Sequence, residues 1–131
     1  MKSDWSPSWE SSKQPRKQRK YLFNLPLHLV HKKMLVAHLA QPLRHTYKRR
    51  SVPIRQGDIV TVLRGQFKGK IGTVDKVLLG RRRVFVTGIH TVKKNGTTIP
   101  YPLVASNLLV TQLHLEDKKR VQALSRGHTN G

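Results

Sequence analysis

The strongest constraint on the fold of this chain is a pair of strand-like runs within residues 56–74, joined by a turn rich in glycine and cations. Residues 59–63 (IVTVL) and 71–74 (IGTV) consist mainly of β-branched residues, a composition typical of short strands. Gly65, Gly69 and Gly72 permit positive φ angles and close approach of another backbone. The segment therefore predicts a tight β-hairpin with residues 64–70 (RGQFKGK) at its tip.

Further strands are predicted downstream at a spacing of roughly ten residues, which favours a small barrel. They cover residues 71–77, 83–87, 91–94, 97–99 and 108–113. Asn95 and Gly96 separate two of these runs, and this pair is typical of a two-residue type I′ hairpin turn, in which both central residues have positive φ. The expected fold class is mainly β: a small SH3-like barrel preceded by a basic α-helical segment and flanked by flexible termini.

Residues 26–50 show helical rather than strand periodicity. The apolar residues at 27, 30, 34 and 35 approximate the i, i+3, i+4, i+7 pattern and predict an amphipathic helix over residues 26–38. Pro42 is suited to open a second short helix, in which Leu43 and Tyr47 share one face. Pro53 ends the helical region, because the residue before a proline is disfavoured in the helical conformation.

Composition divides the chain into a flexible basic tail (1–20), a basic helical segment (21–50), a barrel (51–115) and a C-terminal tail (116–131). The first residues mix Ser, Pro, Lys and the tryptophans Trp5 and Trp9 with no apolar period, which is typical of a flexible segment. Residues 13–20 pack five cations into eight positions, so repulsion is expected to keep them extended until a partner binds. The alternative for this run is a solvated linker.

The charge balance indicates a polyanionic partner. Lys and Arg number 26 against 6 acids, a formal net charge of +20 that repels itself unless a polyanion offsets it. Between Ser11 and Leu115 the only acids are Asp58 and Asp75. Anionic membrane competes with nucleic acid for this role, but no stretch approaches the roughly 18 apolar residues of a spanning helix. Because the chain has no cysteine and its start does not resemble a signal peptide, a cytoplasmic protein is expected.

A set of cations is predicted to contact the phosphates and sugars of RNA: Arg16, Lys17, Arg19, Lys20, Arg49, Arg50, Arg64, Lys68, Lys70, Arg81, Arg82, Arg83, Lys93 and Lys94. Such contacts position a protein without reading base sequence. For the run 81–83 the alternative is a solvated hairpin tip. In the turn 64–70, N–H groups left unpaired by the glycines are expected to meet phosphates alongside the cations. Phe67 either stacks on an unpaired base or plugs one end of the barrel, and the plug is favoured.

Catalysis is weighed and set aside. Asp58 and Asp75 supply no carboxylate pair, and each lies beside a predicted turn. Asp58 is expected to cap a turn next to Gly57. The chain is therefore expected not to be an enzyme and to need no cofactor.

Metal binding and peptide recognition are the remaining alternatives. His31, His38 and His45 are seven residues apart, near one face of a helix, with His28 close by. No carboxylate or thiolate joins them and Pro42 interrupts the helix, so no metal site is expected. SH3-type peptide grooves are lined by aromatic residues, of which this chain has 3 Tyr, 3 Phe and 2 Trp, too few for such a groove.

The central segment resembles a known motif. Gly57-Asp58-Ile59-Val60, Gly65 and residues 67–74 (FKGKIGTV) resemble the KOW motif, which a large-subunit ribosomal protein shares with transcription elongation factors. Residues 16–21, 26–29, 37–39, 49–55, 93–97 and 102–107 extend the likeness to the archaeal and eukaryotic form of universal large-subunit ribosomal protein twenty-four (the eukaryotic protein twenty-six). The resemblance covers about residues 14–118 and gives Gly57, Gly65, Gly69 and Gly72 as motif glycines.

The resemblance implies a structural component of the large ribosomal subunit. Family members bind large-subunit rRNA early in assembly, near the exit of the nascent-peptide tunnel, beside other large-subunit proteins. That location also suggests a secondary contact with nascent chains or targeting factors. Ala40-Gln41 stands where relatives often have a capping Ser, and residues 1–12 have no counterpart in the family. The alternative function is a KOW-type transcription elongation factor or free RNA-binding factor, although residues 1–50 are too short and too basic for the α/β domain that precedes the barrel in elongation factors.

Overall fold

A computed structural model of the chain describes residues 13–126. Their elements in chain order are α1 (Pro15–Phe23), α2 (Leu27–Met34), β1 (Val36–Leu39), α3 (Gln41–Tyr47), β2 (Ser51–Pro53), β3 (Ile59–Val62), β4 (Ile71–Leu78), β5 (Arg83–Val86), β6 (His90–Val92), β7 (Thr98–Pro100), the 3-10 turn η1 (Ala105–Asn107), β8 (Leu108–Gln112) and α4 (Lys118–Ser125). The flexible segments expected at residues 1–12 and 127–131 lie outside the described residues.

The strands form one sheet of six, in the order β2-β1-β8-β3-β4-β5, and a separate two-stranded hairpin, β6-β7. All pairings are antiparallel except that of β1 with β8. The chain leaves β5, returns beside it at the bridge between Val84 and Leu103, and then enters β8 on the other side of β3. This return curls the sheet into a small barrel, so the predicted mainly β fold is confirmed.

The barrel interior is filled by alternate residues of the strands. Val60 and Val62 of β3, Val84 of β5, and Leu108 and Val110 of β8 are at most 1% exposed. Their period of two places one face of each strand in the core and leaves the other to solvent. The other predicted strands near residues 71–77, 83–87 and 108–113 are thereby confirmed to within one or two residues.

The helix predicted over residues 26–38 is wrong in its last four residues. The helix α2 ends at Met34, and Val36–Leu39 forms β1, in which Ala37 and Leu39 are fully buried. Backbone pairing with β2 on one side and β8 on the other decides this conformation. The short helix predicted after residue 41 is confirmed as α3, and Lys48 ends it in the left-handed conformation.

The hairpin at Asn95-Gly96 forms, but its turn is not of the predicted type. The carbonyl of Lys93 accepts from the N–H of Gly96 at 3.0 Å, and the N–H of Lys93 donates to the carbonyl of Thr97 at 2.8 Å. Gly96 has a φ of 86°, whereas Asn95 is not among the residues with positive φ. This is a three-residue loop closed by a left-handed glycine, a common alternative to the two-residue type I′ turn.

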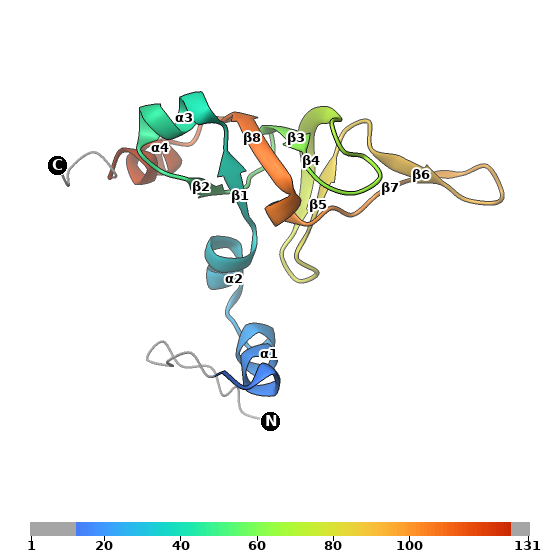
Figure 1. Cartoon of the computed structure of the whole chain (residues 1–131), viewed down its shortest axis with the longest axis horizontal. Coiled ribbons are helices and arrows are strands. Elements are labelled where there is room, and N and C mark those ends of the chain that lie inside the picture. The colour runs from blue at the N-terminus through green and yellow to red at the C-terminus, as the bar shows by residue number, and fades with distance from the viewer. Residues whose placement is uncertain (1–12, 127–131) are drawn as a thin grey trace.

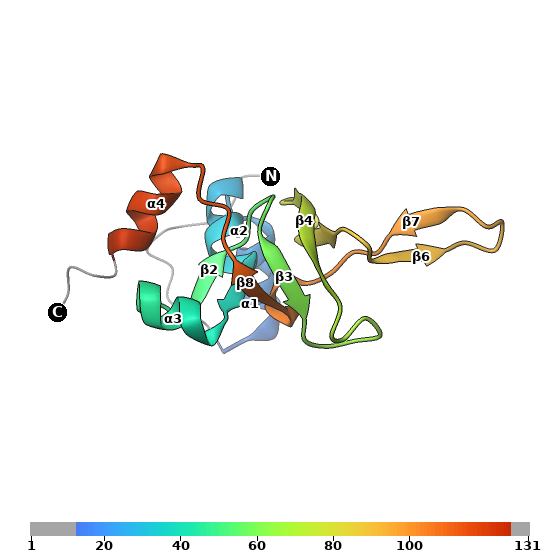
Figure 2. The ribbon, with the colours of Figure 1, turned by 90° about the horizontal axis from the view of Figure 1, so that it is seen from above.

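Two projections extend from the barrel. The helices α1 and α2 form an arm below the sheet, while β6 and β7 extend sideways as a long hairpin (Figure 1). Seen from above, this hairpin lies at the opposite end of the molecule from α3 and α4 (Figure 2). Residues 15–20, which the sequence predicts to be extended without a partner, are helical in α1, although no residue of that helix is buried.

The C-terminal helix α4 is an element that the sequence analysis assigned to a tail. Its Arg120 and Leu124 are 4% and 2% exposed. The guanidinium of Arg120 donates to both carboxylate oxygens of Asp58, at 2.6 and 2.7 Å. Asp58 therefore does more than cap a turn, because it also anchors a helix that lies 62 residues further along the chain.

Candidate nucleic-acid interface

The β3–β4 loop (residues 63–70) carries three of the predicted contact residues: Arg64, Lys68 and Lys70. All three are exposed, and Gly65 and Gly69 adopt φ angles of 96° and 87°, which only glycine adopts without strain. The sequence predicts unpaired N–H groups in this loop, but three of its N–H groups are paired. The N–H groups of Lys68, Gly69 and Lys70 donate to carbonyls of Gly65, Val62 and Phe67. Backbone bonds thus fold this part of the loop, and its cations are the groups presented to a partner.

Phe67 serves as the plug that the sequence favours. It is half-buried, packs against the core and lies with its ring centroid 4.9 Å from that of Tyr101. The ammonium of Lys70 lies 5.1 Å from the centroid of the Phe67 ring, a cation–π contact. The ring therefore anchors the middle of the loop to the barrel and lies beside one of its cations.

The remaining motif glycines have structural roles. A Cβ on Gly72 would lie 2.5 Å from the carbonyl oxygen of Thr87, and a Cβ on Gly57, whose φ is 95°, would lie 2.8 Å from the ring of His114. Gly72 thus permits close packing of β4 against the end of β5, without a positive φ. At both positions the space that a side chain would need is occupied by the chain itself.

The three arginines predicted at residues 81–83 have two different roles. They lie in the β4–β5 turn (residues 79–82) and at the start of β5. Arg81 and Arg83 are exposed. Arg82, with a φ of 55°, donates to the carbonyl of Leu22 and lies with its guanidinium carbon 5.2 Å from the centroid of the Phe23 ring. Arg82 therefore holds the end of α1 against the turn, a role that the sequence did not predict.

The cations of α1 and of the segment before β2 also differ in exposure. Arg16, Lys17, Arg19 and Lys20 are exposed along α1. Arg50 is exposed, whereas Arg49 is half-buried and donates to the carbonyl of Ala123 at 2.6 Å. Arg49 thus ties the turn after α3 to α4.

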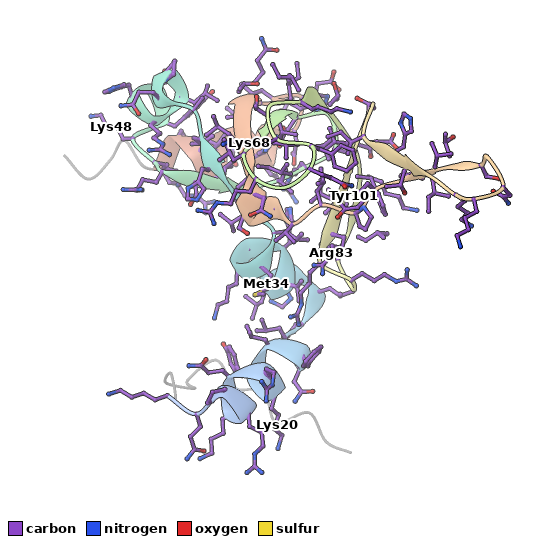
Figure 3. All side chains as sticks on the ribbon, turned by 45° about the vertical axis from the view of Figure 1, so that its right-hand side comes forward. Lys20, Met34, Lys48, Lys68, Arg83 and Tyr101 are labelled. Atoms are coloured by element: carbon purple, nitrogen blue, oxygen red, sulfur yellow. The ribbon has the colours of Figure 1, made fainter. Side chains whose placement is uncertain are left out.

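The predicted cations lie on separate regions of the molecule. Figure 3 shows Lys20 on α1, Lys68 in the β3–β4 loop and Arg83 beside the β4–β5 turn. Lys93 and Lys94 are exposed at the tip of the β6-β7 hairpin. Three further cations are exposed but do not belong to the predicted set: Lys32 and Lys33 on α2, and Lys48 at the end of α3. Their position on predicted basic helices was the signal that could have found them.

The acids and histidines are dispersed. Asp58 is fully buried in its pair with Arg120, and Asp75 is exposed on β4. His28 and His31 lie on α2, His38 on β1 and His45 on α3, so the assumption of one shared helical face is wrong. Within residues 13–126, no group of three or more His, Asp or Glu side chains is arranged to hold a metal ion.

No helix of the described part of the chain is both long enough and apolar enough to cross a membrane.

Fold and surface together define a class: a small, strongly basic β-barrel protein with cationic extensions. A family model that describes eukaryotic L26 and archaeal L24 ribosomal proteins matches residues 12–127. The chain is 46% identical over 115 residues to a protein of Methanosphaera stadtmanae named "Large ribosomal subunit protein uL24", covering 88% of this chain and 97% of that protein. A protein of the same name from Methanospirillum hungatei is 46% identical over 114 residues, covering 87% and 94%.

The chain therefore belongs to the family of eukaryotic L26 and archaeal L24 ribosomal proteins. Members of this family are structural proteins of the ribosome, so the chain is not an enzyme.

Proposed function

We propose that this protein is a structural component of the cytoplasmic large ribosomal subunit that binds large-subunit rRNA through its phosphates. The family and the names of both relatives support the subunit. The proposed contacts are the predicted cations, with Arg49 and Arg82 acting mainly by holding α4 and α1 in place.

The observation that carries the RNA-binding proposal is the exposure of cations on every projection of the molecule. They occupy α1, the β3–β4 loop, the β4–β5 turn and the hairpin tip, while Asp58 and Asp117 are paired with arginines of the same chain. Such an arrangement suits a folded RNA that surrounds the protein, because A-form helices are recognised chiefly through backbone and shape.

The finer roles follow from the family resemblance. They are entry early in assembly, a position near the tunnel exit beside other large-subunit proteins, and a secondary contact with nascent chains or targeting factors. The alternative of a transcription elongation or free RNA-binding factor is not favoured, since both relatives are named as large-subunit proteins.

Sucrose-gradient sedimentation of cell lysate at low and high salt tests the proposal. We expect stoichiometric protein in the large-subunit peak that resists moderate salt. Protein found with RNA polymerase, or at the top of the gradient, would contradict it.

A further inference from the structure

A pocket of about 790 Å³ opens between the arm and the barrel. Leu27 and His28 of α2 form one wall, Val77 of β4 and Leu79 beyond it form another, and His114 and Asp117 before α4 form a third. Its volume lies within the range of about 300–1,000 Å³ that is usual for small-molecule sites. Its lining includes Leu79 of the β4–β5 turn, but none of the cations predicted to contact RNA.

Part of the inner surface of this pocket is apolar. Ile54 is fully buried beneath it, and Val77 and Leu79 are half-buried. Leu27 is 59% exposed at the rim. The apolar part of the lining does not suit a phosphate, which would lose its hydration against it. The lining also holds the cations Arg55, Lys76 and Arg120 and the acids Glu116 and Asp117, but Arg55 and Arg120 are already paired with Asp117 and Asp58.

The rim supplies planar groups together with donors and acceptors. His31 is oriented by its Nε2, which lies 2.7 Å from the carbonyl oxygen of Ile54 and therefore donates to it. The guanidinium of Arg55 is held by an ion pair with Asp117, and His28 is exposed at the mouth. Histidine rings and arginine planes are groups on which unstacked RNA bases stack.

One lysine lies in the pocket lining, and other cations are close to lining residues in the sequence. Lys76 lines the pocket and Arg81 follows Leu79 by two residues, while Lys32 and Lys33 continue α2 past His31. A sugar–phosphate backbone bound at Lys76 would lie beside the pocket. The base attached to it is the part of the RNA that suits the pocket, being planar, neutral and edged with donors and acceptors.

We propose that this pocket receives one unpaired nucleobase of the large-subunit rRNA. The proposal rests on the proposed rRNA-binding function. It assigns a base of that RNA to a pocket that the proposed phosphate contacts do not occupy. It gives the protein one point of base contact in an interface otherwise directed at the backbone.

The test uses the full chain and protein-free large-subunit rRNA. The variants His28→Ala and Leu27→Ser change exposed side chains at the rim, so the fold is retained. His45→Ala, exposed on α3 outside the pocket, is the matched control, and Lys68→Ala is the reference for a phosphate contact. The dissociation constant is measured across a range of salt concentrations, and base accessibility is mapped by chemical probing.

Loss of a stacked base lowers affinity about 5- to 100-fold. We expect such a loss for both pocket variants with an unchanged salt slope, and one base that becomes reactive only in these complexes. His45→Ala should match the wild type, whereas Lys68→Ala should reduce the salt slope by about one.

Three outcomes would overturn the proposal. Unchanged affinity and probing in both pocket variants would show that no base enters. A reduced salt slope would assign the pocket to phosphates, and normal rRNA binding with loss of a neighbouring protein from reconstituted subunits would assign it to a protein side chain. If the wild type itself failed to bind rRNA, the proposed function would fail as well, which is a separate result.

Discussion

At the scale of single residues, the buried pair of Asp58 and Arg120 is the centre of a hydrogen-bond network that joins α4 to the barrel. Asp58 also accepts from the N–H groups of Arg55 and His114, at 3.0 and 2.9 Å, while Arg120 also donates to the carbonyl of His114 at 2.8 Å. A buried ion pair is not strongly stabilising in itself, but removing one partner leaves an uncompensated charge in the core.

Replacing Arg120 with Leu should therefore lower the free energy of unfolding by about 3–5 kcal/mol. Urea denaturation followed by circular dichroism measures the change. Lys119→Leu, at an exposed position on the same helix, is the control and should stay within about 0.5 kcal/mol of the wild type. Equal stability of the two variants would mean that the pair does not hold α4.

Gly72 provides a second residue-scale prediction. Gly72→Ala places a Cβ 2.5 Å from the carbonyl oxygen of Thr87, so the two strands must separate. We expect a loss of about 1–3 kcal/mol in unfolding free energy, typical of overpacking. Gly80→Ala is the matched control, because a Cβ there meets nothing within 4 Å. A loss as large in the control would refute the steric explanation.

At the scale of elements, α4 is held at its start by Asp117. The carboxylate accepts from Arg55 and from the N–H of Lys119, and these hydrogen bonds hold the pKa of Asp117 below its ordinary value of 3.8. A depressed folded-state pKa stabilises the fold above the unfolded value and loses this effect as pH falls through the folded value.

Asp117→Asn should therefore be less stable than the wild type at pH 7, and the difference should shrink steadily as pH falls below about 3.8. Thermal denaturation of both proteins over a pH series measures it. A difference that stayed constant down to the lowest pH would show that the charge of Asp117 does not stabilise α4.

The β4–β5 turn carries a prediction about binding. Arg81→Glu with Arg83→Glu should weaken rRNA binding and leave the fold intact, because both side chains are exposed. Lys118→Glu with Lys119→Glu makes the same change of charge on α4 and should weaken binding less. Filter binding measures both, and equal effects would indicate that only net charge matters. Arg82 is spared because its contacts with the end of α1 dock that helix.

At the scale of the whole molecule, the net charge of +20 is spread over projections that point in different directions. If about eight phosphates are neutralised, log affinity for rRNA should fall with log salt at a slope of roughly −6 to −7. Titrations from low to physiological salt test this, with a fragment of random-sequence RNA as control. A nearly flat response would contradict phosphate-directed binding.

Local patterns predicted well wherever the local chain decides the conformation. The period of two in β3 and the glycines of the β3–β4 loop predicted the hairpin, and the surplus of cations indicated a polyanion. Prediction failed where distant segments decide. Val36–Leu39 continues a helical pattern, yet becomes a strand because β2 and β8 lie on either side of it.

The same division explains the candidate site. Most of the cations were predictable as exposed residues, because charged side chains are seldom buried. Their separate tasks were not, since nothing in the local sequence distinguishes Arg82, which docks α1, from Arg81 and Arg83. Likewise, the local sequence assigned Asp58 to a turn, while its pairing with Arg120 depends on a segment 62 residues away.

Short-range pattern and composition were thus enough to predict the barrel strands, the basic character and the family resemblance. Each of these depends only on neighbouring residues or on residue counts. The strand conformation of residues 36–39, the docking of α1 and α4, and the pocket beside α2 came from the folded chain alone. These features arise from contacts between segments far apart in the sequence. The free energy of such contacts cannot be inferred from a local sequence pattern.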